Sequence, residues 1–170
     1  MTADRYVSLE HWLRGLPQSR QERLAIELAS LVEPFTVLSN QGQPMGGLMP
    51  AAEMVRSSET AVEVDRGRHV LFSMPELADD EPDGLAWFPY RATVAWIYAA
   101  DCKCTAPGDG VVNTFKCVLD ILDAADEALG DTGLAEDLTA RMEDGGDSLS
   151  QLRPKISDAI DQLSTDESHR

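Results

Sequence analysis

The stretch from Val111 to Leu129 constrains the fold most strongly, because its apolar residues recur at the spacing that places them on one side of an α-helix. The residues on that side are Val112, Phe115, Val118, Leu119, Leu122 and Leu129. Asp109 or Gly110 is expected to open this helix, and Gly130 is expected to end it. This is the clearest helix that the sequence predicts.

The first forty residues predict two more helices. Ser8 can cap a short helix that runs to about Arg14. Ser19 and Glu22 have the S-x-x-E spacing of a capping box and predict the start of a second helix. Pro34 is expected to kink or end that second helix, because proline lacks a backbone N–H and its ring crowds the preceding turn.

The rest of the chain contains further helical patterns between stretches rich in glycine and proline. The segment from Ser39 to Pro50 contains too many such residues for a regular element and is expected to be a loop. Pro89 is expected at the first position of its helix, where proline is tolerated. The helices expected in this part are residues 50–57, 89–101, 134–143 and 152–163.

Residues 60–73 are ambiguous. Two apolar stretches, 61–64 and 69–72, flank Asp65-Arg66-Gly67-Arg68, a sequence that could also form a hairpin turn. We favour helix here and keep a small β-hairpin as the alternative. Because the predicted loops are mostly short, the sequence predicts an all-α fold, an antiparallel helical bundle of roughly six to seven helices. Residues 1–163 are expected to form one domain, and residues 164–170 a polar tail.

The composition agrees with a globular helical protein of the cell interior. Of the 170 residues, 43% are hydrophobic and only 6% are aromatic, which favours helices over sheets. Three cysteines and no signal-peptide pattern argue against a disulfide framework, and no apolar stretch is long enough to cross a bilayer. We expect a cytoplasmic protein. The excess of 11 arginines over 3 lysines favours a GC-rich bacterial source.

The net charge of −16 is concentrated in the second half of the chain. Residues 1–75 contain 9 acidic and 7 basic side chains, a net charge of −2, whereas residues 76–170 contain 21 and 7, a net charge of −14. Such a field repels nucleic-acid phosphate and anionic membranes, and it speeds the encounter with a basic partner. We therefore expect a basic protein partner, no nucleic acid and no membrane; the sequence leaves the oligomeric state unknown.

Two stretches resemble the YjaG-like family of uncharacterised bacterial helical proteins. The first reads LRGLPQSRQERLAIELASLVEPFTVLSNQ, from Leu13 to Gln41, and is similar to the family's opening helix pair. The second reads MPELADDEPDGLAWFPYRATVAWIYAAD and, with the helix at 111–129, is similar to its acidic connection and central helix pair. The region from Met45 to Phe72 departs from that pattern. The resemblance implies an all-helical fold and no activity.

Cys102, Cys104 and Cys117 are the first candidates for a metal site. A closed zinc site needs four ligands, and a C-x-C pair with one distant cysteine falls short of that number. The three histidines, His11, His69 and His169, are scattered. We expect buried structural thiols, no bound metal and no cofactor.

Acidic residues on the long helix form the second candidate site. Asp120, Asp123 and Glu127 lie at positions i, i+3 and i+7, with Asp126 beside them. Such a stripe is typical of a solvated surface, but it could also bind a basic partner or hold Mg²⁺. No second acidic motif faces it, so we select Asp120, Asp123 and Glu127 as partner-binding residues.

Aromatic residues gather just before that helix. Trp87, Phe88, Tyr90, Trp96 and Tyr98 lie within twelve residues. Not all of them can face one core, so some are expected at an interface or in a pocket, while core packing is the alternative. From this group we select Trp87, Tyr90 and Trp96 as partner-binding residues.

These observations predict an acidic protein-binding module, such as an immunity-type or antitoxin-type inhibitor of a basic effector. The alternative is a small enzyme or ligand-binding domain with a pocket between the helices at 89–101 and 110–129. No phosphate-loop, dinucleotide-binding, nucleophile-elbow or zinc-protease motif occurs, so we predict no catalytic residue.

Overall fold

The computed structural model describes residues 3–38, 48–78 and 80–168, and every regular element in those ranges is a helix. The predicted all-α class is therefore confirmed. The α-helices are α1 (Ala3–Gly15), α2 (Gln18–Val32), α3 (Leu48–Ser57), α4 (Ala61–Phe72), α5 (Pro75–Ala78), α6 (Trp87–Cys104), α7 (Pro107–Leu129), α8 (Leu134–Glu143) and α9 (Arg153–Ser168). Short 3-10 turns are η1 (Glu33–Val37), η2 (Gly84–Ala86) and η3 (Leu149–Leu152).

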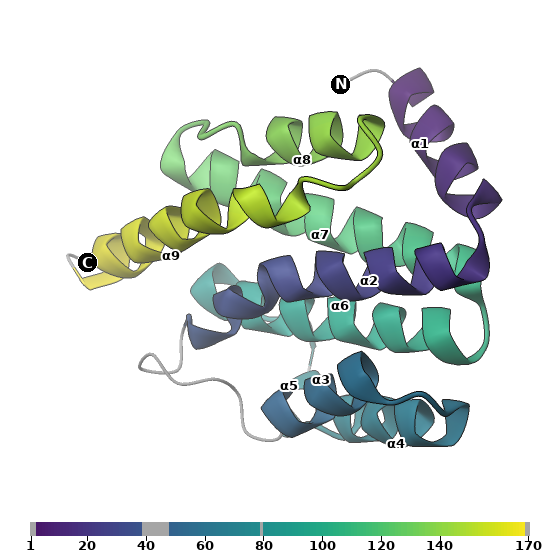
Figure 1. Ribbon diagram of the computed structural model, residues 1–170. Coiled ribbons are helices and arrows are strands. Elements are labelled where there is room, and N and C mark those ends of the chain that lie inside the picture. Colours follow the sequence, from purple (N-terminus) through teal and green to yellow (C-terminus); the bar gives the residue numbers. More distant parts are fainter. Residues whose placement is uncertain (1–2, 39–47, 79, 169–170) are drawn as a thin grey trace.

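Helices α2, α6 and α7 form the centre of the molecule and lie side by side (Figure 1). Their contacts bury Leu28 of α2, Trp96 of α6 and Phe115 of α7 completely or almost completely. Only Thr105 and Ala106 separate α6 from α7, so the chain reverses direction between them. Helices α3 and α4 pack together and α4 covers α6, whereas α1, α8 and α9 pack against α7 (Figure 1).

Within residues 60–73 the chain forms helix α4, Ala61–Phe72, so the alternative of a β-hairpin is wrong. Thr60 caps the helix by accepting a hydrogen bond of 3.4 Å from the backbone N–H of Glu63. Gly67, which suggested a turn, instead marks a close approach of α4 to α3. A Cβ atom added there would lie 3.0 Å from the carbonyl oxygen of Ala51.

The helix starts and caps near the beginning of the chain differ from those predicted. Helix α1 begins at Ala3 rather than near Ser8, and α2 begins at Gln18 after Pro17, without a side-chain cap from Ser19. The structure has no capping box at the start of α2; instead, Gln21 of α2 caps the end of α1. The buried amide of Gln21 donates to the carbonyl oxygens of Leu13 and Arg14, at 2.9 and 3.2 Å. The predicted end of α2 is confirmed, since α2 stops at Val32 and Pro34 lies in η1.

Several later boundaries also differ from those expected. Helix α6 begins at Trp87, two residues before Pro89, which is tolerated because N–H groups of the first turn have no partner inside a helix. Helix α7 begins at Pro107 rather than at Asp109 or Gly110 and ends at Leu129, and Gly130, which follows it, adopts the left-handed conformation, as predicted for its end. Helix α9 continues through Ser168, so most of the expected polar tail is helical. The loop predicted from Ser39 lies outside the described residues up to position 47, and α3 begins at Leu48.

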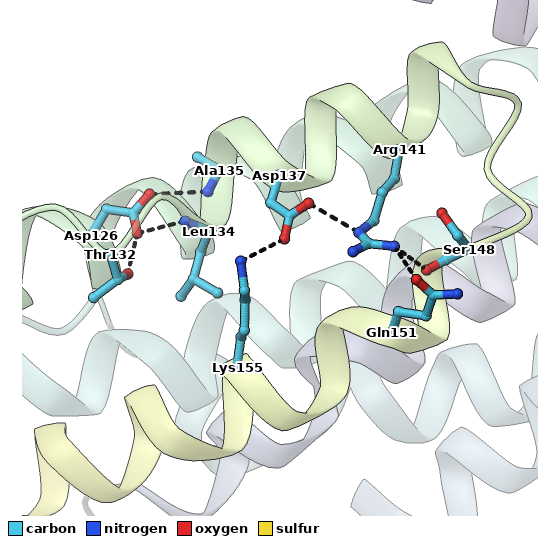
Figure 2. Close-up of polar contacts among 9 residues, drawn as sticks. All are labelled: Asp126, Thr132, Leu134, Ala135, Asp137, Arg141, Ser148, Gln151 and Lys155. Carbon is cyan, nitrogen blue, oxygen red and sulfur yellow. Dashed lines mark hydrogen bonds and ion pairs between the residues drawn. The ribbon is translucent and has the colours of Figure 1, made fainter.

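Polar contacts fasten α8 to α7 and α9 (Figure 2). Asp126 of α7 accepts hydrogen bonds from the backbone N–H groups of Leu134 and Ala135, at 2.9 and 3.0 Å. Farther along α8, Asp137 accepts from Arg141 Nε at 3.0 Å and from Lys155 Nζ of α9 at 2.9 Å. These contacts fix α8 and α9 beside the acidic part of α7.

The Asp137 carboxylate should contribute to stability only while it is ionised. Burial raises its pKa, but the hydrogen bonds from Lys155 and Arg141 outweigh burial and leave the pKa below its ordinary value of 3.8. Asp137→Asn should therefore lower the free energy of unfolding by about 1 kcal/mol at neutral pH, where the full effect is present. The difference from wild type should shrink as the pH falls from about 5 to about 2, through the lowered pKa of the folded state.

Urea unfolding at several pH values measures this effect, and Asp158→Asn, at an exposed position of α9, is the control. A difference between Asp137→Asn and wild type that persists unchanged at the lowest pH would contradict the assignment to the ionised pair.

No helix in the described parts of the chain is long and apolar enough to cross a membrane.

Candidate partner-binding surface

The three selected carboxylates lie on the exposed side of α7, opposite its buried apolar stripe. Asp120, Asp123 and Glu127 line one side of a shallow, open hollow of about 430 Å³, and the side chain of Asp120 is 62% exposed. Trp87 lines the same hollow. The structure thus brings together four of the six residues that the sequence analysis selected.

The indole of Trp87 is half-buried and is held by three contacts. Its Nε1–H donates a hydrogen bond of 2.6 Å to Glu81 Oε1. The guanidinium of Arg91 lies 5.9 Å from the centre of the ring, within the range of a cation–π contact. Phe88 contacts the ring edge-on, with 5.4 Å between ring centres. These contacts fix the orientation of an aromatic side chain at the edge of the acidic stripe.

Arg91 partly neutralises the negative charge of the hollow. Its Nη2 atom lies 3.3 Å from Asp120 Oδ2. Burial raises the pKa of Asp120 above its ordinary value; Arg91 opposes that rise and the neighbouring carboxylate of Asp123 adds to it. The lining contains four carboxylates, from Glu81, Asp120, Asp123 and Glu127, against this single guanidinium. Negative charge therefore remains for a cationic group of a partner.

The assignment of Trp96 to the surface is wrong. Its side chain is fully buried in the core, and the guanidinium of Arg56 from α3 lies 5.0 Å from its ring centre. Trp96 follows Trp87 by nine residues, about two and a half helical turns, so the two side chains leave opposite sides of α6. Tyr90 itself is half-buried and lines neither the hollow nor the groove described next.

A larger groove of about 990 Å³ continues from the hollow, because Trp87, Ala124 and Glu127 line both. The segment around η2 and the start of α6 form one wall, and the last turns of α7 and α9 form the rest. Sequence reasoning missed the contribution of α9, namely Leu163 and Asp166, which lie more than sixty residues from the aromatic cluster. No local pattern indicates that contact.

Tyr6 was also missed, although it lies beside the acidic stripe. It lines a smaller hollow with Asp123 and Asp126. Burial raises the pKa of Tyr6, and the charges of Asp123 and Asp120 raise it further. The acidic stripe is therefore bordered by an aromatic residue on each side, Tyr6 from α1 and Trp87 from α6.

Helices α6 and α7 approach each other closely at the end away from the hollow, next to the turn that joins them. Gly110 of α7 lies against the backbone of Cys102 of α6, and buried side chains such as Ala95 and Val118 fill this part of the core. The hollow and the groove, which both border these two helices, are open to solvent.

The three cysteines do not gather into one site. Cys102 donates to the carbonyl oxygen of Pro107 and Cys117 to that of Arg91, each at 3.3 Å. Burial raises the pKa of both thiols to about 12, so they are protonated at neutral pH. Among the residues that the structure describes, no group of three or more His, Cys, Asp or Glu side chains is arranged to hold a metal ion.

Comparison of this chain with protein-family models, curated proteins and solved structures gives no match. The resemblance to the YjaG-like family therefore stays a prediction.

Proposed function

We propose that this chain is an acidic protein-binding module, built on an antiparallel helical bundle, that binds a basic protein in the bacterial cytoplasm. The observation that carries the proposal is the arrangement of Asp120, Asp123 and Glu127 around the half-buried indole of Trp87 in one open hollow. Aromatic side chains anchor many protein interfaces, and surrounding charges steer the encounter. An immunity-type or antitoxin-type inhibitor is the concrete form that we propose.

The charge distribution supports a protein partner rather than a nucleic acid or a membrane. The net charge of −14 over residues 76–170 repels phosphate in both. A basic effector whose own active surface holds phosphate would instead be attracted, and the carboxylates would occupy that surface.

Neutralising the stripe should slow association with the basic partner. The partner is first obtained by co-purification from the native host. The triple variant Asp120→Asn, Asp123→Asn and Glu127→Gln should then bind about tenfold more slowly at low salt, because electrostatic steering is lost. The association rate of the wild type should also fall more steeply than that of the variant as ionic strength rises from about 0.01 to about 0.15 M.

Rates are measured by stopped-flow mixing, and circular dichroism checks the helices of each variant. The matched control removes three exposed carboxylates outside the hollow, with Glu59→Gln, Glu63→Gln and Asp144→Asn. An association rate that falls equally in both triple variants would mean that only net charge matters. An unchanged rate in the first variant would show that the stripe is a solvated surface.

The size of the groove favours a second candidate, a small enzyme or ligand-binding domain. Its volume of about 990 Å³ is at the upper end of the usual range for small-molecule sites, roughly 300–1,000 Å³. The acidic and open surroundings favour the protein partner instead. Co-purification distinguishes the two, since it yields a basic protein in one case and a small molecule in the other.

A further inference from the structure

The groove next to the acidic hollow combines an apolar floor with an acidic rim. Leu85, Trp87, Phe88 and Leu163 supply apolar surface. Phe88 and Leu163 are almost fully buried, whereas Leu85 and Trp87 are half-buried, so the floor is firmly packed and open on one side. Such a floor offers a place for a large apolar side chain to leave water.

The rim of the groove carries one sign of charge. Asp83 from the loop before η2, Glu127 from α7 and Asp166 from α9 line it, and its lining among the described residues includes no lysine or arginine. The hollow with Asp120 and Asp123 adjoins it through Trp87 and Glu127. A single continuous surface thus offers an apolar site between two groups of carboxylates.

We propose that this groove receives a short segment of a protein partner in which one large apolar side chain is flanked by lysine or arginine residues. This inference rests on the proposed function and adds to it the recognition element of the partner. The apolar side chain packs on the Trp87 indole and on Leu163, and the flanking cations pair with the carboxylates of the rim. Buried aromatic anchors surrounded by polar rims are the usual design of such sites.

Charge complementarity selects this occupant over the others that an apolar groove could hold. A second copy of the chain carries the same charge of −16 and is repelled. An anionic membrane is repelled for the same reason. A neutral small molecule would fill the floor but leave the carboxylates of the rim without cationic partners.

Three synthetic pentapeptides with blocked ends test the inference on the full-length protein. The first is Lys-Arg-Phe-Arg-Lys, the second replaces its Phe by Ala, and the third replaces its four cations by Glu. Titrations are followed by NMR at the indole N–H of Trp87, with the buried Trp96 as an internal control. We expect the Phe peptide to bind about tenfold more tightly than the Ala peptide and to shift the Trp87 signal, while Trp96 stays unchanged.

A variant that obstructs the groove without altering charge sharpens the test. Ala128 is an exposed residue of α7 that lines the groove, and Ala128→Gln should weaken binding of the Phe peptide at least several-fold. Glutamine is a good helix former, so the helix is retained. Ala61→Gln, at an exposed position of α4, is the matched control and should bind like the wild type.

The outcomes separate this inference from the proposed function. Equal binding of the Phe and Ala peptides overturns the apolar site but does not contradict the acidic surface. The same conclusion follows if no peptide shifts the Trp87 signal while the co-purified partner still needs Asp120, Asp123 and Glu127. Equal binding of the acidic peptide contradicts the basic partner itself. A Trp87 signal that moves with protein concentration alone, together with dimer formation in sedimentation, assigns the groove to a second copy and overturns the inference.

Discussion

Replacing Gly110 by alanine should destabilise the protein by about 3 kcal/mol, at the upper end of the usual cost of overpacking. A Cβ atom at this position would lie 2.4 Å from both the Cα and the backbone N of Cys102. These are backbone atoms of α6, so no side chain can rotate away to make room. The central helices α6 and α7 must then separate, which opens the core next to Phe115 and Trp96.

Thermal and urea unfolding of Gly110→Ala measure this effect, and the melting temperature should fall by about 6–12 °C for a chain of this size. Gly15→Ala is the control, because no atom lies within 4 Å of a Cβ added there. That variant should be neutral or slightly stabilising, since alanine favours a helix over glycine. Two variants of equal stability would contradict the close approach of α6 and α7.

The parts of the fold that follow from local sequence were predictable. Helix α7 was recognised from its apolar stripe, and its end from Gly130, which adopts a left-handed conformation with φ of 82°. Helix α8 has the boundaries expected, Leu134 to Glu143, because an apolar pattern precedes Gly145 and Gly146. In these segments spacing and chain-breaking residues point to the same structure.

The parts that depend on distant contacts were not predictable. Val62 and Val64 beside Asp65-Arg66-Gly67-Arg68 fit a hairpin as well as a helix, and the packing of Gly67 against α3 decides the matter. The start of α2 was misjudged because Gln21 serves the end of α1, a role that a search for local caps does not reveal.

In the candidate surface, too, the features that follow from local spacing were predictable and those that depend on distant contacts were not. The spacing of Asp120, Asp123 and Glu127 correctly placed them on one exposed face. The clustering of aromatic residues did not reveal that Trp87 reaches this face while Trp96 enters the core. That distinction depends on which side of α6 the rest of the fold covers, and Arg56 of α3 is among the residues that lie over Trp96. The contribution of Leu163 requires knowledge of how α9 crosses the end of α7.

Asp126 belongs to the same acidic run but has a structural role, and its replacement by alanine should destabilise the protein by about 2–4 kcal/mol. Its side chain accepts hydrogen bonds from the hydroxyl of Thr132 and from the backbone N–H groups of Leu134 and Ala135. The residue is only 8% exposed, so water cannot readily replace the carboxylate. Truncation would leave donors at the start of α8 without a partner, which costs more than the hydrogen bonds themselves contribute.

Two further substitutions, one at Asp126 and one at Asp123, show whether this loss of stability comes from the lost cap or from the lost charge. Asp126→Asn keeps one acceptor oxygen and should lose about half as much stability as Asp126→Ala. Asp123→Ala removes an exposed carboxylate three residues away and should change stability by less than about 0.5 kcal/mol. Hydrogen exchange at Leu134 and Ala135 should accelerate in Asp126→Ala beyond the change expected from global unfolding, because the first turn of α8 opens locally. If Asp123→Ala and Asp126→Ala prove equally stable, Asp126 is one more surface acid and α8 begins without it.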